Sequence, residues 1–182
     1  MTAVTEWEQA YQRFETPEQE RRKFIRRLRS LGVHEWSRDT RVLEICSGRG
    51  NGLIAWRRLG FSNVFGVDLS PALVERSESR RWCVVGDARR LPISTASRDV
   101  AIVQGGLHHL LSLDDVREAL GEMRRVLKPD GRVIIIAEPA LTGADCRVEW
   151  ANGGIERDLA STFASIEQSA ERWRASTSAE EN

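Results

Sequence analysis

Residues 42–52 read VLEICSGRGNG, a short and mainly apolar run that leads directly into a loop with three glycines. Such a run before a glycine loop is typical of a buried β-strand, and residues 52–59 follow it with the spacing of a helix. Glycines let the backbone approach a ligand closely, and the first amides of a helix have no partner inside it. The stretch therefore predicts a strand, a turn and a helix whose start binds an anionic group.

The same alternation of strand and helix continues to residue 137. We expect strands over 41–45, 63–67, 82–85, 98–103 and 131–137, and helices over 52–59, 71–79 and 114–127. Short apolar runs between helices are typical of parallel strands that are buried on both faces. The predicted fold is therefore α/β, a doubly wound, Rossmann-like and mostly parallel sheet with strand order 3-2-1-4-5.

Both ends of the chain differ from this alternating core. Residues 5–31 have a helical pattern in two pieces, because Thr16-Pro17-Glu18-Gln19 supplies an N-cap, a proline at the first helical position and a capping-box partner. After Pro139 the sequence becomes loop-like, and apolar residues then recur at helical spacing from Ile155 to Trp173. We expect a helix there and no convincing strand pair.

The length of 182 residues suits one domain with one core. We expect three segments within it. Residues 1–38 form an N-terminal helical segment, residues 39–139 form the Rossmann-like core, and residues 140–182 form a loop, a helix and a frayed tail.

Composition excludes several classes of partner. The chain has 27 Lys and Arg residues against 27 Asp and Glu residues, so it lacks a net basic field that would attract nucleic acid. Its three cysteines, Cys46, Cys83 and Cys146, lie far apart, which favours reduced thiols over a disulfide framework or a metal site. No signal peptide and no apolar run long enough to cross a bilayer is visible. We expect a cytoplasmic protein without a nucleic-acid, membrane or metal partner.

Two acidic residues follow the next predicted strands. Asp68 ends the second strand 20 residues beyond Gly48, where an acidic side chain in such folds accepts hydrogen bonds from ribose hydroxyls. Asp87 follows the third strand, where it could accept from the exocyclic amine of adenine. Each of them could instead be a strand-end or helix-cap residue. The loop itself is neither G-x-G-x-x-G, because Leu53 replaces the third glycine, nor a Walker A motif.

Five segments in this order resemble the class I S-adenosylmethionine-dependent methyltransferases, in particular the small-molecule branch related to the enzymes of ubiquinone and menaquinone biosynthesis. The similarity covers residues 40–139. The segments are VLEICSGRGNG, GVDLSPALVERS, VVGDARRLPI, SRDVAIVQGGLHHL and MRRVLKPDGRVIIIAEP. The resemblance implies S-adenosylmethionine as the cofactor, a small-molecule acceptor and an N-terminal segment that lies over the cofactor as a lid.

The resemblance also implies roles for individual residues. Glu44 and the loop of Ser47, Gly48 and Gly50 would bind the methionine part of the cofactor. Asp68 would bind the ribose, with Leu69 beside it. Asp87 and Ala88 would bind the adenine, and Gln104 would lie near the methionyl group and the substrate.

The sequence departs from the family pattern at two places. Cys46 stands where the family usually has glycine, so the first tight turn must accommodate a side chain. The family's sheet normally has two further strands, which residues 140–182 do not obviously supply. Either the chain is a truncated form, or its fifth strand is an edge that something else covers, for example a second copy in a homodimer.

Methyl transfer is a direct displacement, in which holding the nucleophile in line matters more than a catalytic triad. An acceptor that begins as a phenol or hydroxyl also needs a base. His108 and His109 follow the turn at Gly105-Gly106 and are the candidates, because an unperturbed imidazole titrates near neutral pH. The alternative is that these histidines cap a helix or pack against their leucine neighbours.

Other functions compete with methyl transfer. A short-chain reductase needs a Tyr-x-x-x-Lys pair, which is excluded because Tyr11 is the only tyrosine. A degenerate or truncated cofactor-binding protein without turnover remains open. Methylation of RNA bases is disfavoured because Gln104-Gly105-Gly106-Leu107 stands where an Asn/Asp-Pro-Pro-aromatic motif is expected.

Overall fold

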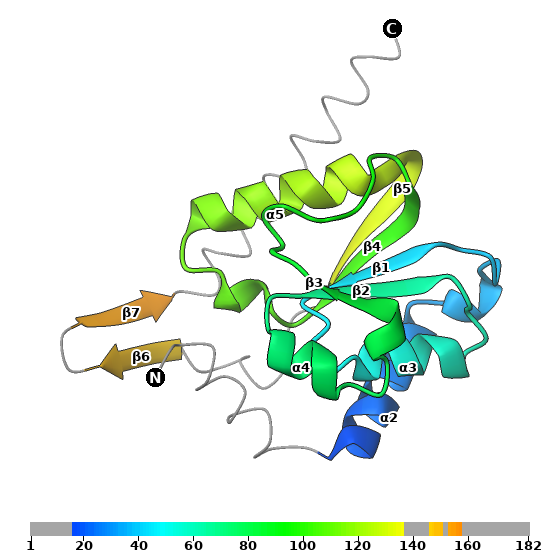
Figure 1. Cartoon of the computed structure of the whole chain (residues 1–182), viewed down its shortest axis with the longest axis horizontal. Helices are drawn as coiled ribbons and strands as arrows, with labels where there is room; N and C mark the ends of the chain where they lie inside the picture. The colour runs from blue at the N-terminus through cyan, green and yellow to red at the C-terminus, as the bar shows by residue number, and fades with distance from the viewer. Residues whose placement is uncertain (1–15, 137–145, 151–152, 158–182) are drawn as a thin grey trace, which may run out of the picture. The chain divides into compact units, whose positions relative to one another are not determined.

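The computed structural model describes residues 16–136, 146–150 and 153–157. The chain divides into two units, Met1–Ala137 and Glu138–Asn182, and each is described by itself. The first unit has a five-stranded sheet with helices on both faces (Figure 1).

The sheet has the predicted order β3-β2-β1-β4-β5, and every neighbouring pair in it is parallel. Its strands are β1 (Val42–Ile45), β2 (Val64–Asp68), β3 (Cys83–Val85), β4 (Arg98–Gln104) and β5 (Leu127–Ile136). Because β1 pairs with β2 on one side and β4 on the other, the order reverses at the centre of the sheet. Such a switch point is where doubly wound sheets bind ligands.

Helix α5 covers one face of the sheet, and α2, α3 and α4 lie on the other (Figure 1). The helices are α2 (Pro17–Ser30), α3 (Asn51–Arg58), α4 (Pro71–Arg76) and α5 (Leu113–Val126), with short 3-10 turns η1 (Val33–Glu35), η2 (Arg80–Trp82) and η3 (Leu107–His109). Val42 packs with Trp56 of α3, whereas Leu43 packs with Met123 of α5. Alternate residues of β1 thus pack into hydrophobic clusters on opposite faces of the sheet. Glu44 lies on the same face as Val42.

The start of α2 confirms the predicted capping box. The Thr16 hydroxyl accepts from the Gln19 amide, the Gln19 side chain accepts from the Thr16 amide, and Pro17 occupies the first turn. The first piece of the predicted N-terminal helix, before Thr16, lies outside the described residues.

Two predicted boundaries within the core are wrong. The helix expected over 71–79 ends at Arg76, because Ser77 adopts an extended conformation and its side chain turns to other partners. The last strand begins at Leu127 rather than residue 131. It pairs with Arg98 at Leu127 and with Val100 only at Arg132, so residues 128–131 bulge out of the ladder within the strand.

The second unit contains an antiparallel hairpin, β6 (Cys146–Trp150) and β7 (Gly153–Arg157). The expectation of no strand pair in residues 140–182 is therefore wrong, as is a helical reading of Ile155, which pairs with Val148. The hairpin forms its own sheet, so β5 has β4 as its only neighbour among the described residues. The predicted helix after residue 157 lies outside those residues, and self-association through β5 stays a prediction.

No helix within the described ranges is both long enough and apolar enough to cross a membrane.

Candidate functional site

The loop after β1, residues Cys46–Gly50, is fastened to the end of β2. The Gly48 amide donates to Asp68 Oδ2 at 2.6 Å, and the Ser47 amide donates to the Val67 carbonyl at 3.1 Å. Gly50 has a φ of 70°, and a Cβ there would lie 1.7 Å from the Ser79 hydroxyl oxygen. Only glycine fits this position, which explains the predicted glycine loop in physical terms.

Cys46 occupies the turn position where a side chain was expected to cause difficulty. Its φ is 55°, in the left-handed region. The opposing turn makes room for it, because a Cβ on Gly106 would lie 2.5 Å from the Cys46 Cβ. The tight turn therefore accommodates the Cys46 side chain because the facing residue after β4, Gly106, has no side chain of its own.

The surroundings of Cys46 show that three predicted acidic residues converge. Burial, followed by the negative charges of Asp68, Asp87 and Glu44 in that order, raises the pKa of the Cys46 thiol to about 12. The thiol is thus protonated at neutral pH and is a poor nucleophile. The carboxyl groups of Glu44, Asp68 and Asp87 are therefore all close enough to Cys46 to act on its charge.

Glu44 is a buried acid with an unused oxygen. Its side chain is 2% exposed, and burial followed by the charge of Glu20 raises its pKa to about 8, opposed by the Gln104 amide. A Cβ on Gly52 would lie 2.0 Å from Glu44 Oε1, so the carboxyl group lies directly against the start of α3. Among the described residues, Glu44 Oε2 and both polar side-chain atoms of buried Gln104 make no hydrogen bond of normal length and angle, although the Gln104 amide lies close enough to Glu44 to lower its pKa. Buried polar atoms without partners are costly, and this cluster is suited to a polar ligand.

Asp68 has a structural task as well as a place in the site. Its carboxylate accepts from the amides of Gly48 and Ser70, the latter at 2.9 Å, while burial raises its pKa. The N-cap of α4 is Ser70 rather than Asp68, so the helix-cap alternative is wrong, whereas Asp68 does end β2, as the strand-end alternative has it, and its ribose role stays a prediction. The adjacent Leu69 is 59% exposed.

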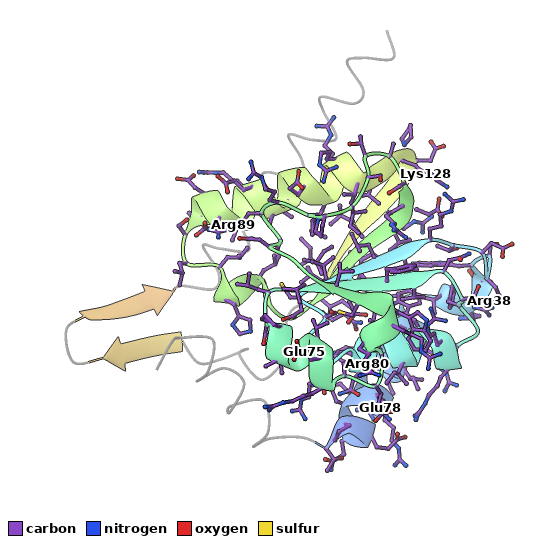
Figure 2. All side chains as sticks on the ribbon, in the orientation of Figure 1. Arg38, Glu75, Glu78, Arg80, Arg89 and Lys128 are labelled. Carbon is purple, nitrogen blue, oxygen red and sulfur yellow. The ribbon has the colours of Figure 1, made fainter. Side chains whose placement is uncertain are left out.

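Asp87 lies after β3 and is engaged by an arginine that sequence reasoning did not single out. Arg89 donates from its amide at 2.8 Å and from its guanidinium at 2.6 Å to the Asp87 carboxylate, and these bonds lower the pKa of Asp87. Arg89 lies beside the first turn of α5 (Figure 2), where it also pairs with Asp115 at 2.7 Å. The neighbouring Ala88 is buried.

The two candidate histidines belong to η3, which follows the end of β4. Its backbone is fixed by hydrogen bonds from Gly105 to the Ile136 carbonyl and from His109 to the Gly106 carbonyl, both at 2.9 Å. His109 is half-buried, and the side chain of His108 lies outside what the structure describes. The backbone thus places both at the carboxyl edge of the sheet, but their role as a base stays a prediction.

Parallel strands bring these residues to one edge, because β1 to β4 all end there. Sequence reasoning missed the side chains that hold the loop from outside it: Glu20, Arg21, Asn51, Ser77 and Ser79. Their spacing in the sequence gave no signal. Within the part of the chain that is described, no group of three His, Cys, Asp or Glu side chains could hold a metal ion.

Comparison with known proteins gives a family for this site. A family model described as a methyltransferase domain matches residues 43–135, just over half of the chain. The demethylmenaquinone methyltransferase of Staphylococcus aureus is 31% identical over 124 residues, which cover 63% of this chain and 49% of the relative. A methyltransferase-like protein of Encephalitozoon cuniculi is 27% identical over 70% of this chain and 59% of its own length. The chain thus spans between half and six tenths of these curated relatives.

Solved structures show the same fold. A Pyrococcus horikoshii protein, PH0226, superposes with a TM-score of 0.56 at 30% identity and covers 64% of this chain and 57% of its own. An S-adenosylmethionine-dependent methyltransferase of Archaeoglobus fulgidus superposes with a TM-score of 0.53 at 23% identity, covering 62% of this chain and 51% of its own, a likeness of fold alone. The family match lies on the sheet, loop and helices described above, and the chain therefore belongs to the class I S-adenosylmethionine-dependent methyltransferases.

Proposed function

We propose that the chain binds S-adenosylmethionine at the carboxyl edge of its sheet and serves the transfer of the methyl group to a small-molecule acceptor by direct displacement. The observation that carries the proposal is the buried pair of Glu44 and Gln104, whose polar atoms lack normal hydrogen bonds, with the Glu44 carboxyl group against the start of α3. Family membership supports it independently.

The residues around the loop suit the methionine end of the cofactor. Gly50 is the N-cap of α3 and makes no side-chain capping bond, so the first amides of the helix suit a carboxylate. The free oxygen of Glu44 suits an ammonium group, because a buried carboxylate is stabilised by an opposite charge nearby. Ser47, Gly48 and Gly50 would shape the loop around this end, and Gln104 would lie near the methionyl group.

The next two strand ends suit the adenosine. The Asp68 carboxylate keeps acceptor capacity beyond its two amide bonds and would accept from the ribose hydroxyls. Leu69 and Val85, which are 59% and 47% exposed, offer apolar surface for a base. Asp87 and Ala88 would contact the adenine, and Asp87 would do so while it is still held by Arg89.

The bound cofactor would supply a methyl group on a positively charged sulfur, which is an electrophile without further activation. The chain's own contribution is then to orient both reactants, which in favourable cases lowers a barrier by roughly 7–11 kcal/mol. His108 or His109 would remove a proton from a hydroxyl acceptor. Neither the comparisons nor the described residues favour the alternative of cofactor binding without turnover.

Replacing Asp68 by alanine is expected to weaken S-adenosylmethionine binding by roughly 1.5–3 kcal/mol, the contribution of a hydrogen bond to a charged group. Titration calorimetry on wild type and variant measures this difference. The matched control is Glu75→Ala, an exposed acid on α4 whose loss should leave the affinity unchanged. Equal affinities of Asp68→Ala and wild type would reject the ribose assignment, and absence of wild-type binding would reject the proposed function.

A further inference from the structure

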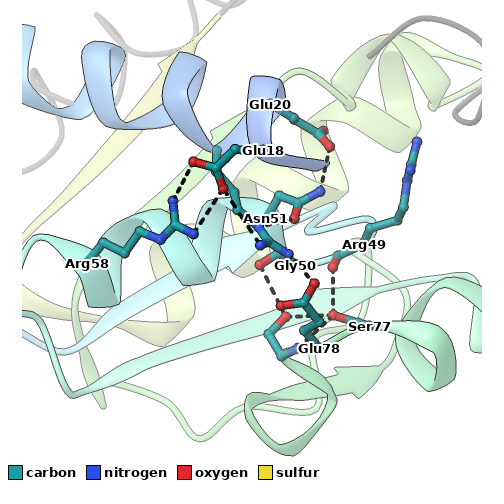
Figure 3. Close-up of polar contacts among 10 residues, drawn as sticks. Glu18, Glu20, Arg49, Gly50, Asn51, Arg58, Ser77 and Glu78 are labelled. Carbon is teal, nitrogen blue, oxygen red and sulfur yellow. Dashed lines mark hydrogen bonds and ion pairs between the residues drawn. The ribbon is translucent and has the colours of Figure 1, made fainter. Parts of the chain in front are cut away.

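A polar network on α2 reaches the glycine loop, although the proposed function makes no use of it. Asn51, the first residue of α3, is 2% exposed, and its side-chain amide is shared between two charged residues of α2 (Figure 3). Arg21 Nε donates to Asn51 Oδ1 at 2.8 Å, and Asn51 Nδ2 donates to Glu20 Oε2 at 2.7 Å. The residue directly after Gly50 is therefore fixed by an element outside the sheet.

The segment after α4 fixes the same loop through its carbonyls. Ser77 Oγ donates to the Arg49 carbonyl at 2.6 Å, and Ser79 Oγ donates to the Gly50 carbonyl at 3.1 Å. The two hydroxyls also lie 2.7 Å apart, within hydrogen-bonding distance. Between these serines, Glu78 pairs with the Arg21 guanidinium at 2.5 Å, which joins the two sides. We call the set Glu20, Arg21, Ser77, Glu78 and Ser79 the loop clamp.

Helix docking alone does not account for the clamp. Arg58 already ties α3 to α2 through two 3.0 Å bonds to Glu18, on the exposed side of the pair (Figure 3). Arg21 instead is 9% exposed, and burying a guanidinium is costly unless every donor is used. The buried charges contact Asn51, the residue directly after the loop, and Glu20 also acts on the pKa of Glu44.

From this geometry we propose that Arg21 is a positioning residue, which holds Asn51 and thereby the glycine loop in the conformation that accepts S-adenosylmethionine. The inference rests on the proposed function for its ligand. It adds that α2, outside the residues matched by the family model, is part of the binding machinery.

The test compares Arg21→Met with Arg58→Met in the full chain. Both variants remove one α2–α3 guanidinium and keep much of the alkyl stem, but only the first removes a bond to Asn51 beside the loop. We expect S-adenosylmethionine to bind Arg21→Met roughly tenfold more weakly, the equivalent of one net hydrogen bond, and to bind Arg58→Met as wild type does. Amide hydrogen exchange at residues 48–51 of the free protein should accelerate in Arg21→Met alone.

Equal losses of cofactor affinity in the two variants, or an unchanged rate of amide hydrogen exchange in the loop of Arg21→Met, would contradict the proposal that Arg21 positions the loop. If Arg21→Met does not fold, Glu78→Ala takes its place, since the Glu78 side chain is 69% exposed and its loss cannot open the core. Faster loop exchange in Glu78→Ala than in Arg58→Met supports the clamp, and equal rates overturn it. Because exchange is measured without ligand, failure of the wild type to bind S-adenosylmethionine contradicts the proposed function and leaves the clamp to be decided separately.

Discussion

Gly52→Ala is expected to destabilise the protein and to abolish measurable S-adenosylmethionine binding, whereas Gly121→Ala is expected to stabilise it. Both glycines are inside helices, where alanine is ordinarily favoured by roughly 0.5–1 kcal/mol. A Cβ at Gly121 meets nothing within 4 Å. A Cβ at Gly52 would lie 2.0 Å from Glu44 Oε1, and because Glu44 is 2% exposed, its carboxyl group can move aside only within a packed interior.

At Gly52 the replacement of glycine by alanine should therefore lower the stability of the protein, whereas in most helix interiors it raises stability. Overpacking in a core typically costs about 1–3 kcal/mol, which exceeds the gain in helix propensity. Urea unfolding of the two variants measures the stability, and calorimetry measures the affinity. A Gly52→Ala protein that is as stable as Gly121→Ala, or that binds the cofactor normally, would show that Glu44 does not lie against α3 as described.

The second large effect concerns pH. Glu44 has a pKa of about 8 in the folded chain against 4.5 for an ordinary glutamate, so between these values the folded state keeps a proton that the unfolded state has lost. This group therefore makes the protein less stable as pH rises across that window, by up to about 1.4 kcal/mol per pH unit, and its effect is constant outside the window. Glu44→Gln removes the titration and keeps the shape of the side chain.

We expect the stability of Glu44→Gln relative to wild type to rise from pH 5 to pH 8 and then to level off. The acids whose pKa is lowered, such as Asp87 and Glu122, lose their stabilising effect only as pH falls into the acid range, outside most of this window. Urea unfolding at several pH values measures the difference. Parallel pH profiles for the two proteins would mean that Glu44 titrates normally.

Cofactor affinity provides a separate readout for the same variant. An ammonium group beside Glu44 favours the ionised carboxylate, so binding to wild type should release a proton near neutral pH. The side-chain amide introduced by Glu44→Gln cannot ionise, so this variant should release no proton on binding and should bind the cofactor more weakly. Calorimetry in buffers of different ionisation enthalpy detects the release in wild type and its loss in the variant.

The sheet could be predicted from the sequence because its signal is local. Short apolar runs and the glycine loop give β1 to β4 within a residue or two, and the shared edge of parallel strands correctly brings Asp68 to Gly48. The β6–β7 hairpin was missed although Cys146, Val148 and Trp150 alternate with charged residues, a pattern typical of a strand. The apolar residues from Ile155 onward also recur at helical spacing, and this pattern led to the prediction of a helix instead of a strand.

The remaining site features depend on partners that are distant in sequence. Asn51 reads as an ordinary first helical residue, and only folding brings it to Arg21, 30 residues earlier. Ser77 and Ser79 read as the end of a helix, and their hydroxyls reach Arg49 and Gly50 only in three dimensions. Such contacts leave no periodicity in the sequence, which is why the loop was predicted but its support was not.

The bulge at residues 128–131 has a practical use. It lies where β4 and β5 begin, at the opposite end of the sheet from the glycine loop, and Lys128 within it is 39% exposed. Lys23 is the only other lysine in the chain. With Lys23→Arg and a blocked N-terminal amine, an amine-reactive linker would find Lys128 as its sole lysine target, and a protein immobilised there would present the proposed ligand-binding edge to a library of candidate acceptors.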